Sequence, residues 1–581
     1  MRILFLTHSF NSLAQRLWVE LTERGHEVSV EFDINEAVAL EAVELFRPDL
    51  VLAPFLKRSI PGAVWRGRVC LVVHPGIPGD RGPSALDWAI LEGETEWGVT
   101  VLQANAVMDG GDIWAVRRFP MRAACKGSLY RNEVTEAATS AVLEAVEKLE
   151  RGGFLPTPLD YADPAVRGRE RPLMKQEDRR IDWAREDTAT VLRKLRAADG
   201  FPGVADRIAG VDCWLYDGHA EGGLRGRRPG AVIARRRGAL CLATVDGAVW
   251  ITHARRKSVE PGFKLPAALA LPEAAAGVPE SALPVLPSRD PSTWQDISYE
   301  ERSGVGYLHF DFYNGAMSTA DCLRLRDAFV EATHRDTRVI VLMGGPDFWS
   351  NGIHLNTIEA ADSPADESWA NINAMDDLCR AILECDERLV VAAMQGNAGA
   401  GGVFLALTCD RVLARAGIVL NPHYKGMGNL YGSEYWTYLL PRRVGSERSQ
   451  AITGSRLPIG ARQAQRLGLV DECLGGSVPE FAASVRRLAA ELAARRDFAR
   501  LIEEKRAARA RDEAHKPLEA YREEELANMK LNFYGFDPSY HVARYHFVHR
   551  VPHAWTPLHL ARHRRRLWLG RAPRAQREPR P

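Results

Sequence analysis

Hydrophobic residues between positions 1 and 160 gather in short continuous runs, and the stretches between these runs carry apolar residues at helical spacing. The runs predict β-strands at Ile3–Thr7, Val28–Phe32, Leu50–Ala53, Val69–Val73 and Val99–Ala104. The segments Leu13–Arg24 and Glu36–Phe46 repeat apolar residues every three to four positions, which predicts amphipathic helices. Because strands that alternate with helices form βαβ units, residues 1–160 are expected to fold around a largely parallel sheet.

A different pattern follows in the middle of the chain. Short apolar segments separated by glycine turns run from Ala205 to His253, which predicts a small barrel-like β-domain over residues 161–260. Residues 261–295 are rich in proline, alanine and serine and show no apolar period. We interpret this segment as an interdomain linker.

A second alternating pattern begins at Ile297. It predicts strands at Val305–Phe310, Val339–Met343 and Leu389–Met394, with a helix at Asp321–Thr333. These elements indicate a second α/β domain over residues 296–480, followed by a helical extension with a basic tail over 481–581. The sequence thus predicts an α/β multidomain protein.

The net charge, the cysteine spacing and the length of the apolar runs exclude several classes of protein. The 581 residues carry a formal net charge of +1, which argues against a general nucleic-acid-binding protein. The nine cysteines form no CxxC pair, so neither a zinc site nor a disulfide framework is expected. No apolar run approaches the roughly 18 residues of a membrane span. We expect a soluble cytoplasmic protein without a bound metal, and a solvated tail between Arg562 and Arg580.

The first candidate site follows the strand Val69–Val73. His74 lies at the carboxyl end of this strand, and Asp109 lies on the glycine-rich loop after the next strand. Open α/β sheets bind ligands at this edge. The first turn lacks the GxGxxG pattern of dinucleotide-binding proteins, so a dinucleotide cofactor is disfavoured. Asn11 or Ser12 is expected to cap the following helix, or to bind an anion at its N-terminus.

The residues from His74 to Ile113 read His-Pro-Gly…Pro-Gly-Asp-Arg-Gly-Pro-Ser-Ala-Leu-Asp-Trp…Met-Asp-Gly-Gly-Asp-Ile, and this pattern resembles the 10-formyltetrahydrofolate-dependent formyltransferases. The resemblance implies a Rossmann-like domain in which His74 and Asp109 are catalytic and Arg81 and Gly82 shape the folate-side loop. The family's catalytic Asn falls at Val72, which cannot donate a hydrogen bond to the formyl oxygen. Either another donor replaces it or the acceptor chemistry differs. Residues 174–203 resemble the beginning of the same family's small OB-like domain.

A second resemblance covers roughly residues 300–480. The segments Phe348–Leu355 and Gln395–Gly402 resemble the crotonase (enoyl-CoA hydratase/isomerase) family, which has a ClpP/crotonase superhelical α/β fold and binds coenzyme A thioesters. Motif matching puts the two oxyanion-binding N–H groups at Ile353 and Gly401, with Gly352 and Gly402 allowing close approach of the ligand.

The acids of the hydratases are missing from this second region. Phe404 stands at the position of the first glutamate, and residues 421–423 lack the second acid, so hydration of a double bond is disfavoured. Tyr424 and Glu434 remain in an aromatic run. They form either an acid–base pair on a bound thioester or an aromatic core with an interface acid, and the residues alone favour neither.

The whole architecture resembles the HypX family of hydrogenase maturation factors, which is associated with carbon monoxide supply for nickel–iron hydrogenase. The resemblance implies formyl transfer from 10-formyltetrahydrofolate to coenzyme A, and then release of CO from formyl-CoA with Tyr424 or Glu434 removing the formyl proton. It also implies hydrogenase maturation proteins as partners. Two alternatives stay open: a formyltransferase for an amine with a second domain that binds an acyl-CoA, and a non-catalytic CoA-binding scaffold.

Overall fold

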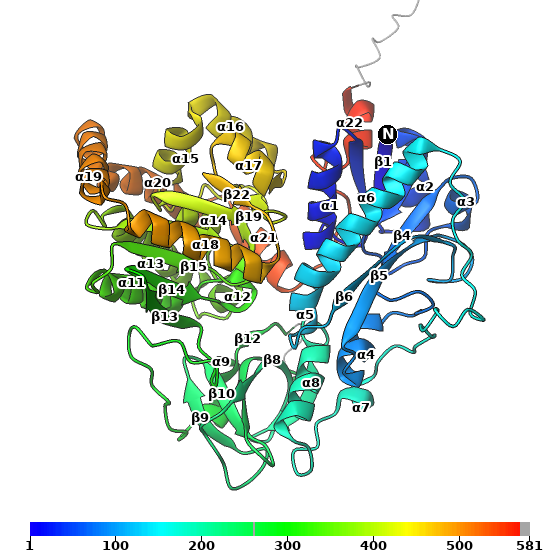
Figure 1. Ribbon diagram of the computed structural model, residues 1–581, viewed down its shortest axis with the longest axis horizontal. Helices are drawn as coiled ribbons and strands as arrows, with labels where there is room; N and C mark the ends of the chain where they lie inside the picture. The colour runs from blue at the N-terminus through cyan, green and yellow to red at the C-terminus, as the bar shows by residue number, and fades with distance from the viewer. Residues whose placement is uncertain (259–261, 570–581) are drawn as a thin grey trace, which may run out of the picture. The chain divides into compact units, whose positions relative to one another are not determined.

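The structure is a computed structural model that describes residues 1–258 and 262–569. Within this described part the chain forms two compact units (Figure 1). The first unit comprises residues 1–123 and 129–173 together with the chain from Pro552 onward. The second comprises residues 124–128 and 174–551. Among the described residues, no helix combines the length and the apolar character needed to cross a bilayer.

The first unit is built on a sheet with the strand order β2-β1-β3-β4-β5-β6. Its strands are β1 (Arg2–Thr7), β2 (Glu27–Phe32), β3 (Leu50–Ala53), β4 (Cys70–His74), β5 (Glu96–Gln103) and β6 (Ile113–Pro120). The strands from β1 to β4 are parallel, as expected, whereas β5 and β6 are antiparallel to their neighbours. The sequence analysis missed β6, because Arg117 and Arg118 interrupt its apolar pattern. A loop as short as the one after β5 can only join antiparallel strands.

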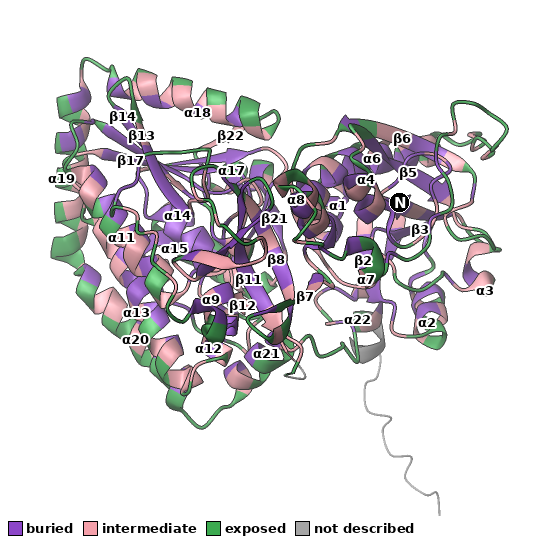
Figure 2. Cartoon of the chain, turned by 90° about the horizontal axis from the view of Figure 1, so that it is seen from below, coloured by how far each residue is buried: buried purple, intermediate pink, exposed green. Residues whose placement is uncertain are grey.

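Helices cover the faces of this sheet. They include α1 (Ser12–Glu23), α2 (Glu36–Phe46), α4 (Ala85–Glu92) and α6 (Thr135–Arg151). Both α1 and α6 bury one apolar face and leave polar residues outside, which is the amphipathic pattern of surface helices. Figure 2 shows the strands as buried and the outer sides of the helices as exposed.

The C-terminal segment returns to the first unit, although the sequence analysis expected a solvated tail. Residues 562–569 form α22 (Arg562–Leu569), which packs on β2 and α2 (Figure 1). The Val30 N–H donates to the Leu560 carbonyl. Glu31, only 1 % exposed, forms ion pairs with His563 and Arg564. A buried carboxylate on an edge strand needs such partners, and this explains why the basic segment docks here. Residues 570–581 lie outside the described residues.

We expect Glu31→Gln to loosen this docking. Burial raises the pKa of Glu31, but hydrogen bonds from His563, Thr556 and Arg564 outweigh it and hold the pKa below its ordinary value of 4.5. The ionised carboxylate therefore stabilises the fold above about pH 4.5, and this contribution disappears as the pH falls through the lowered pKa. Near neutral pH the substitution should reduce the opening free energy of β2 by about 3 kcal/mol, measured by hydrogen exchange of the Val30 amide.

The control for this experiment is Glu41→Gln. Glu41 pairs with the same Arg564 but is half exposed, so its loss should change the opening free energy by less than about 1 kcal/mol. Equal exchange rates in the wild type and in Glu31→Gln at neutral pH would contradict the assigned role.

The barrel-like part of the second unit is an antiparallel sheet with the order β7-β8-β11-β10-β9, and β12 pairs with β11. Its strands are β7 (Val204–Ile208), β8 (Val211–Glu221), β9 (Val232–Arg236), β10 (Ala239–Ala243), β11 (Ala248–Arg256) and β12 (Leu265–Pro266). Helix α8 (Thr188–Ala198) packs on β8.

The segment interpreted as a linker, 261–295, differs from the expectation in its described part. It contains β12 and the short helices α9 (Ala267–Ala270) and α10 (Pro272–Ala275), which bury Leu271 and several alanines in the core of the barrel-like domain. Alanine is a strong helix former and proline suits the first turn of a helix, so this composition also fits short helices.

The rest of the second unit contains two sheets. One has the order β13-β14-β15-β17-β19-β22, and the other has the order β16-β18-β20-β21. The first consists of β13 (Ile297–Arg302), β14 (Val305–Phe310), β15 (Val339–Met343), β17 (Leu389–Met394), β19 (Arg411–Arg415) and β22 (Glu472–Leu474). The second consists of β16 (Phe348–Ser350), β18 (Asn397–Gly399), β20 (Val419–Asn421) and β21 (Ile459–Gly460).

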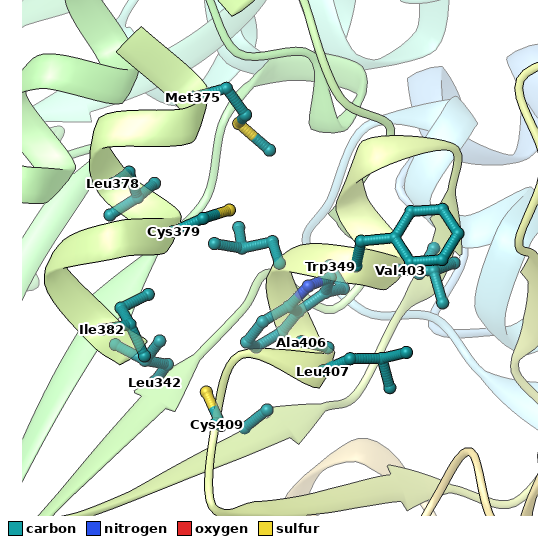
Figure 3. Close-up of a cluster of buried hydrophobic side chains, with 14 of the residues drawn as sticks. Leu342, Trp349, Met375, Leu378, Cys379, Ile382, Val403, Ala406, Leu407 and Cys409 are labelled. Carbon is teal, nitrogen blue, oxygen red and sulfur yellow. The ribbon is translucent and has the colours of Figure 1, made fainter. Parts of the chain in front are cut away.

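Helices α11 (Thr319–Thr333), α13 (Pro364–Leu383) and α14 (Gly401–Leu407) complete the core around these sheets. Figure 3 shows Leu378 and Ile382 of α13 in one hydrophobic cluster with Trp349 of β16 and Leu407 of α14. The C-terminal part of this unit forms α18 (Val478–Ala493), α19 (Phe498–His515), α20 (Leu518–Tyr534) and α21 (Ser539–Val548). Helix α20 packs on α13.

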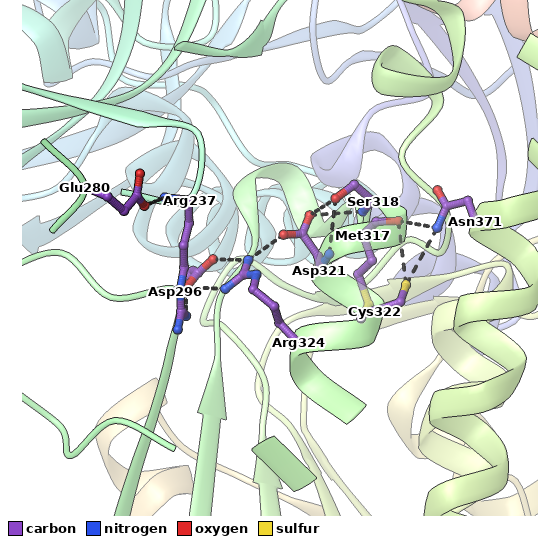
Figure 4. A network of polar contacts seen from close by, with 9 residues as sticks. All are labelled: Arg237, Glu280, Asp296, Met317, Ser318, Asp321, Cys322, Arg324 and Asn371. Atoms are coloured by element: carbon purple, nitrogen blue, oxygen red, sulfur yellow. Dashed lines mark hydrogen bonds and ion pairs between the residues drawn. The ribbon is translucent and has the colours of Figure 1, made fainter. Parts of the chain in front are cut away.

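Partly buried ion pairs connect the barrel-like domain with α11 (Figure 4). The Asp296 carboxylate accepts from Arg237, which follows β9, and from Arg324 on α11. Burial raises the pKa of Asp296, but the two guanidinium groups outweigh it and lower the pKa overall. The network continues through Asp321, which pairs with Arg324 and caps α11 together with Ser318.

Candidate functional site

His74 is the last residue of β4, and its ring is held between two carboxylates. The ring is 4 % exposed. Its Nε2 atom lies 2.9 Å from Asp80 Oδ2, and its Nδ1 atom lies 3.5 Å from Asp109 Oδ2. The fold thus brings the two predicted residues together. The sequence analysis missed Asp80, although its place six residues after His74, within the quoted motif, was a usable signal.

The two carboxylates determine the charge of the ring. Burial lowers the pKa of His74, but the hydrogen bond to Asp80 and the negative charges of Asp109 and Asp80 outweigh it, so the pKa is raised. The second carboxylate oxygen of Asp80 lies 3.2 Å from Nε of Arg171, and this ion pair helps to hold the carboxylate in place. A protonated imidazole in this position can donate a proton or stabilise a developing negative charge.

Arg81 and Gly82 lie on the loop that passes this pair. The Gly82 N–H donates to Asp109 over 3.4 Å. The Arg81 guanidinium pairs with Glu170 and lies over the ring of Tyr161. A Cβ built on Gly76 would lie 2.4 Å from His74 Nε2, so the loop can pass the ring only because this residue is glycine.

The other two residues predicted for this site lie in the first turn. The Asn11 side chain accepts from the Ala14 N–H and caps α1, and Ser12 is the first residue of that helix. Val72 lies on β4, two residues before His74 and therefore on the same face of the strand. It packs against an apolar cluster that includes Ile60.

The second group of predicted residues is built around Ile353 and Gly401. Gly401 is the first residue of α14, so its N–H has no acceptor within the helix. The Met317 N–H donates to the Gly352 carbonyl and the His354 N–H donates to the Met317 carbonyl, which turns the Ile353 N–H to the other side. A Cβ on Gly352 would lie 3.4 Å from the Gly401 nitrogen, so the two backbone segments are adjacent.

A side chain of α13 also holds the backbone around Ile353 in place. The Asn371 side chain accepts from the His354 N–H over 3.1 Å and donates to the Met317 carbonyl over 3.0 Å. Asn371 is fully buried, and Figure 4 shows it closing the polar network that begins at Asp296. The backbone of this segment is therefore set before any ligand arrives.

Glu434 faces the Gly401 backbone. A Cβ on Gly401 would lie 2.0 Å from Glu434 Oε1, and the Tyr424 hydroxyl donates to Glu434 Oε2. Burial, followed by the negative charge of Asp376, raises the pKa of Glu434 to about 8. Burial and the neighbouring Glu434 raise the pKa of Tyr424 well above its ordinary value. Phe404 stacks on Tyr424 with ring centroids 5.4 Å apart.

The structure therefore brings Ile353, Gly352, Gly401, Tyr424 and Glu434 together in the second unit. Two backbone N–H groups beside a buried tyrosine–carboxyl pair can hold a carbonyl oxygen and exchange a proton with the group attached to it.

Gly402 lies differently from what the sequence analysis expected. A Cβ on it would lie 2.0 Å from the Ser350 carbonyl oxygen, and its own carbonyl accepts from the Trp349 indole. Its missing side chain therefore serves the packing of α14 on β16.

Comparisons with known proteins agree with this division. Three family models match: formyl transferase over residues 1–146, the formyl transferase C-terminal domain over 173–261, and enoyl-CoA hydratase/isomerase over 301–535. Methionyl-tRNA formyltransferase of Desulfotalea psychrophila is 32 % identical over 211 residues, which are 35 % of this chain and 63 % of that protein. The matches confirm the predicted fold class of a Rossmann-like formyltransferase domain with a crotonase fold.

Two further proteins match along nearly the whole chain. Hydrogenase maturation factor HoxX of Bradyrhizobium diazoefficiens is 57 % identical over 571 residues, covering 98 % of this chain and 99 % of that protein. The crystal structure of HypX from Aquifex aeolicus in complex with tetrahydrofolic acid superimposes with a TM-score of 0.94 at 52 % identity, covering 97 % of this chain and 99 % of that one.

Proposed function

The chain belongs to the family of hydrogenase maturation factors that includes HoxX and HypX, and we propose that it makes carbon monoxide for hydrogenase maturation. In this proposal it transfers a formyl group from 10-formyltetrahydrofolate to coenzyme A and then decarbonylates formyl-CoA. One observation carries the proposal: a tyrosine–glutamic acid pair faces the oxyanion-type N–H groups in the second unit, where the hydratases have their own acids. Such a pair suits removal of a proton rather than addition of water.

The first reaction takes place at His74. The thiol of coenzyme A attacks the formyl carbon, a C–S bond forms, the C–N bond to tetrahydrofolate breaks, and the thiol proton passes to the leaving nitrogen. The raised pKa of His74 favours the protonated ring, which donates its proton to the leaving amine and takes up the thiol proton in exchange. Asp80 and Asp109 hold the ring in place, and its charge stabilises the tetrahedral intermediate in place of the missing Asn at Val72.

The second reaction takes place at Gly401. The N–H groups of Ile353 and Gly401 hold the formyl oxygen, and Glu434 removes the formyl proton while the C–S bond breaks. Carbon monoxide leaves, and the proton passes to the thiolate, so coenzyme A is regenerated without any redox partner. Tyr424 is hydrogen-bonded to Glu434. It orients the Glu434 carboxylate and passes on the proton that Glu434 has taken from the formyl group.

The substrates follow from the same residues. Arg81 and Gly82 shape the loop on the folate side. The crystal structure of HypX from Aquifex aeolicus contains tetrahydrofolic acid, which supports a folate as substrate of this chain. Asn11 and Ser12 begin α1, where an anionic group of a substrate would meet free N–H groups. Gly352 admits the thioester close to Gly401. The product implies partners among the cytoplasmic proteins of hydrogenase maturation.

The test is an isotope-tracing experiment. Purified protein receives coenzyme A and 10-formyltetrahydrofolate labelled in the formyl carbon, and reduced myoglobin traps the released gas. We expect labelled CO in an amount equal to the tetrahydrofolate formed. A formylated amine without CO would favour an amine formyltransferase, and coenzyme A binding without folate turnover would favour a scaffold. Either result would overturn the proposal.

A further inference from the structure

The backbone that presents Glu434 has an unusual conformation. Glu434 and Tyr435 have φ angles of 61° and 58°, so two consecutive residues with side chains occupy the left-handed region. This region disfavours residues with a Cβ, and such strain persists only where the surroundings hold the backbone firmly. The strained turn directs the Glu434 carboxyl to the Gly401 backbone. The groups that hold the turn therefore determine where this carboxyl lies.

Asp376 on α13 holds the first half of the turn. Its Oδ1 atom accepts from the Glu434 N–H over 2.8 Å, and both of its oxygens accept from the Ser433 hydroxyl, at 2.9 and 2.7 Å. The side chain of Asp376 is fully buried. Nothing in the sequence pattern links it to the site, because Asp376 lies on a helix far away along the chain.

Glu525 on α20 holds the second half. It accepts from the Tyr435 N–H over 2.9 Å and from the Thr437 N–H over 2.8 Å. The two carboxyl groups thus hold the turn from both sides, one from α13 and one from α20. Since α20 packs on α13, both supports belong to one assembly of helices.

We propose that Asp376 is a positioning residue for Glu434: it holds the Glu434 carboxyl against the Gly401 backbone and places a negative charge beside it. The proposal rests on the proposed function, in which Glu434 removes the formyl proton. A fixed carboxylate next to a second carboxyl makes the latter a stronger base, and the fixed backbone keeps this base in reach of the substrate.

The charges around Glu434 support this assignment. The groups that face it are Tyr424, Cys322 on α11, Asp376 and Cys379 on α13, and Glu525 on α20. Arg522 on α20 lies 3.9 Å from the Asp376 carboxylate. Burial raises the pKa of Asp376 to about 6, and burial also raises the pKa values of Glu434 and Glu525 to about 8. Asp376 is the most acidic of the three carboxyls, because Ser433, the Glu434 N–H and Arg522 favour its ionised form. Asp376 is therefore the carboxyl that is ionised at neutral pH and carries the negative charge beside Glu434.

Infrared titration of the protonated Glu434 carboxyl tests the proposal without turnover. The band is identified by its loss in Glu434→Gln. Asp376→Asn keeps an oxygen acceptor for the Glu434 N–H but removes the charge, so the titration midpoint should fall below that of the wild type. The pH profile of CO release should move to lower pH by the same amount. Asp376→Ala removes the acceptor as well and should lower the rate of CO release by about 10²-fold.

Asp377→Asn is the matched control, since it removes a charge from the next position of α13, where the partly exposed side chain pairs with Arg522. Its midpoint should stay at the wild-type value. An unchanged midpoint in Asp376→Asn would overturn the proposal, and so would full activity in Asp376→Ala. If the wild type released no CO while Asp376→Asn still lowered the midpoint, the proposed function would fail and the positioning of Glu434 by Asp376 would stand.

Discussion

Replacing Glu434 with glutamine is expected to lower CO release by about 10²–10⁴-fold, the range for the loss of an acid–base group. Glutamine has nearly the same shape and still accepts from Tyr424, but it cannot take up the formyl proton. Formyl transfer in the first unit should continue, so formyl-CoA should accumulate. The measurement follows CO with myoglobin and formyl-CoA by mass spectrometry.

The wild type should show a matching pH dependence. Because burial and Asp376 raise the pKa of Glu434 to about 8, most of the carboxyl is protonated at neutral pH. The ionised form is the base, so CO release from added formyl-CoA should rise as the pH increases through about 8. Tyr424→Phe keeps the ring that stacks on Phe404 and should reduce the rate less than Glu434→Gln. Undiminished CO release in Glu434→Gln would exclude this residue as the base.

Replacing His74 with alanine should lower formyl transfer to coenzyme A by about 10²–10⁴-fold. The variant loses the proton donor to the leaving amine and leaves the buried Asp80 carboxylate and the partly buried Asp109 carboxylate without the ring between them. Formation of tetrahydrofolate, followed by its absorbance, measures this step directly.

Formyl-CoA added to His74→Ala provides the internal control. If the two reactions use separate groups of residues, the variant should decarbonylate added formyl-CoA at the wild-type rate. Asp109→Asn should cause a smaller loss of transfer, because Asp80 still holds the ring at 2.9 Å. Normal tetrahydrofolate formation in His74→Ala would show that the transfer takes place elsewhere.

The sequence predicts the candidate site residues best where they lie in one continuous motif. His74, Arg81, Gly82 and Asp109 lie within a short stretch, and the strand and loops that carry them follow from local apolar patterns. The same holds for Ile353 and Gly401, since each N–H group is set by a glycine-rich segment entering a helix. The family and the fold class could therefore be predicted from the sequence. The linker was misjudged, because an alanine- and proline-rich composition fits both a flexible connection and short packed helices.

Only the tertiary structure decided the groups that tune these residues. Arg171 reaches Asp80, Asp376 reaches Glu434, and the C-terminal segment reaches Glu31, each from a distant part of the chain. Hydrogen bonds and charges act over a few ångströms in space, and the spacing along the sequence does not record that distance. The sequence by itself determined the type of fold and pointed to the residues that we propose carry the chemistry. The packing of helices and strands determined how each is oriented and which of them is charged.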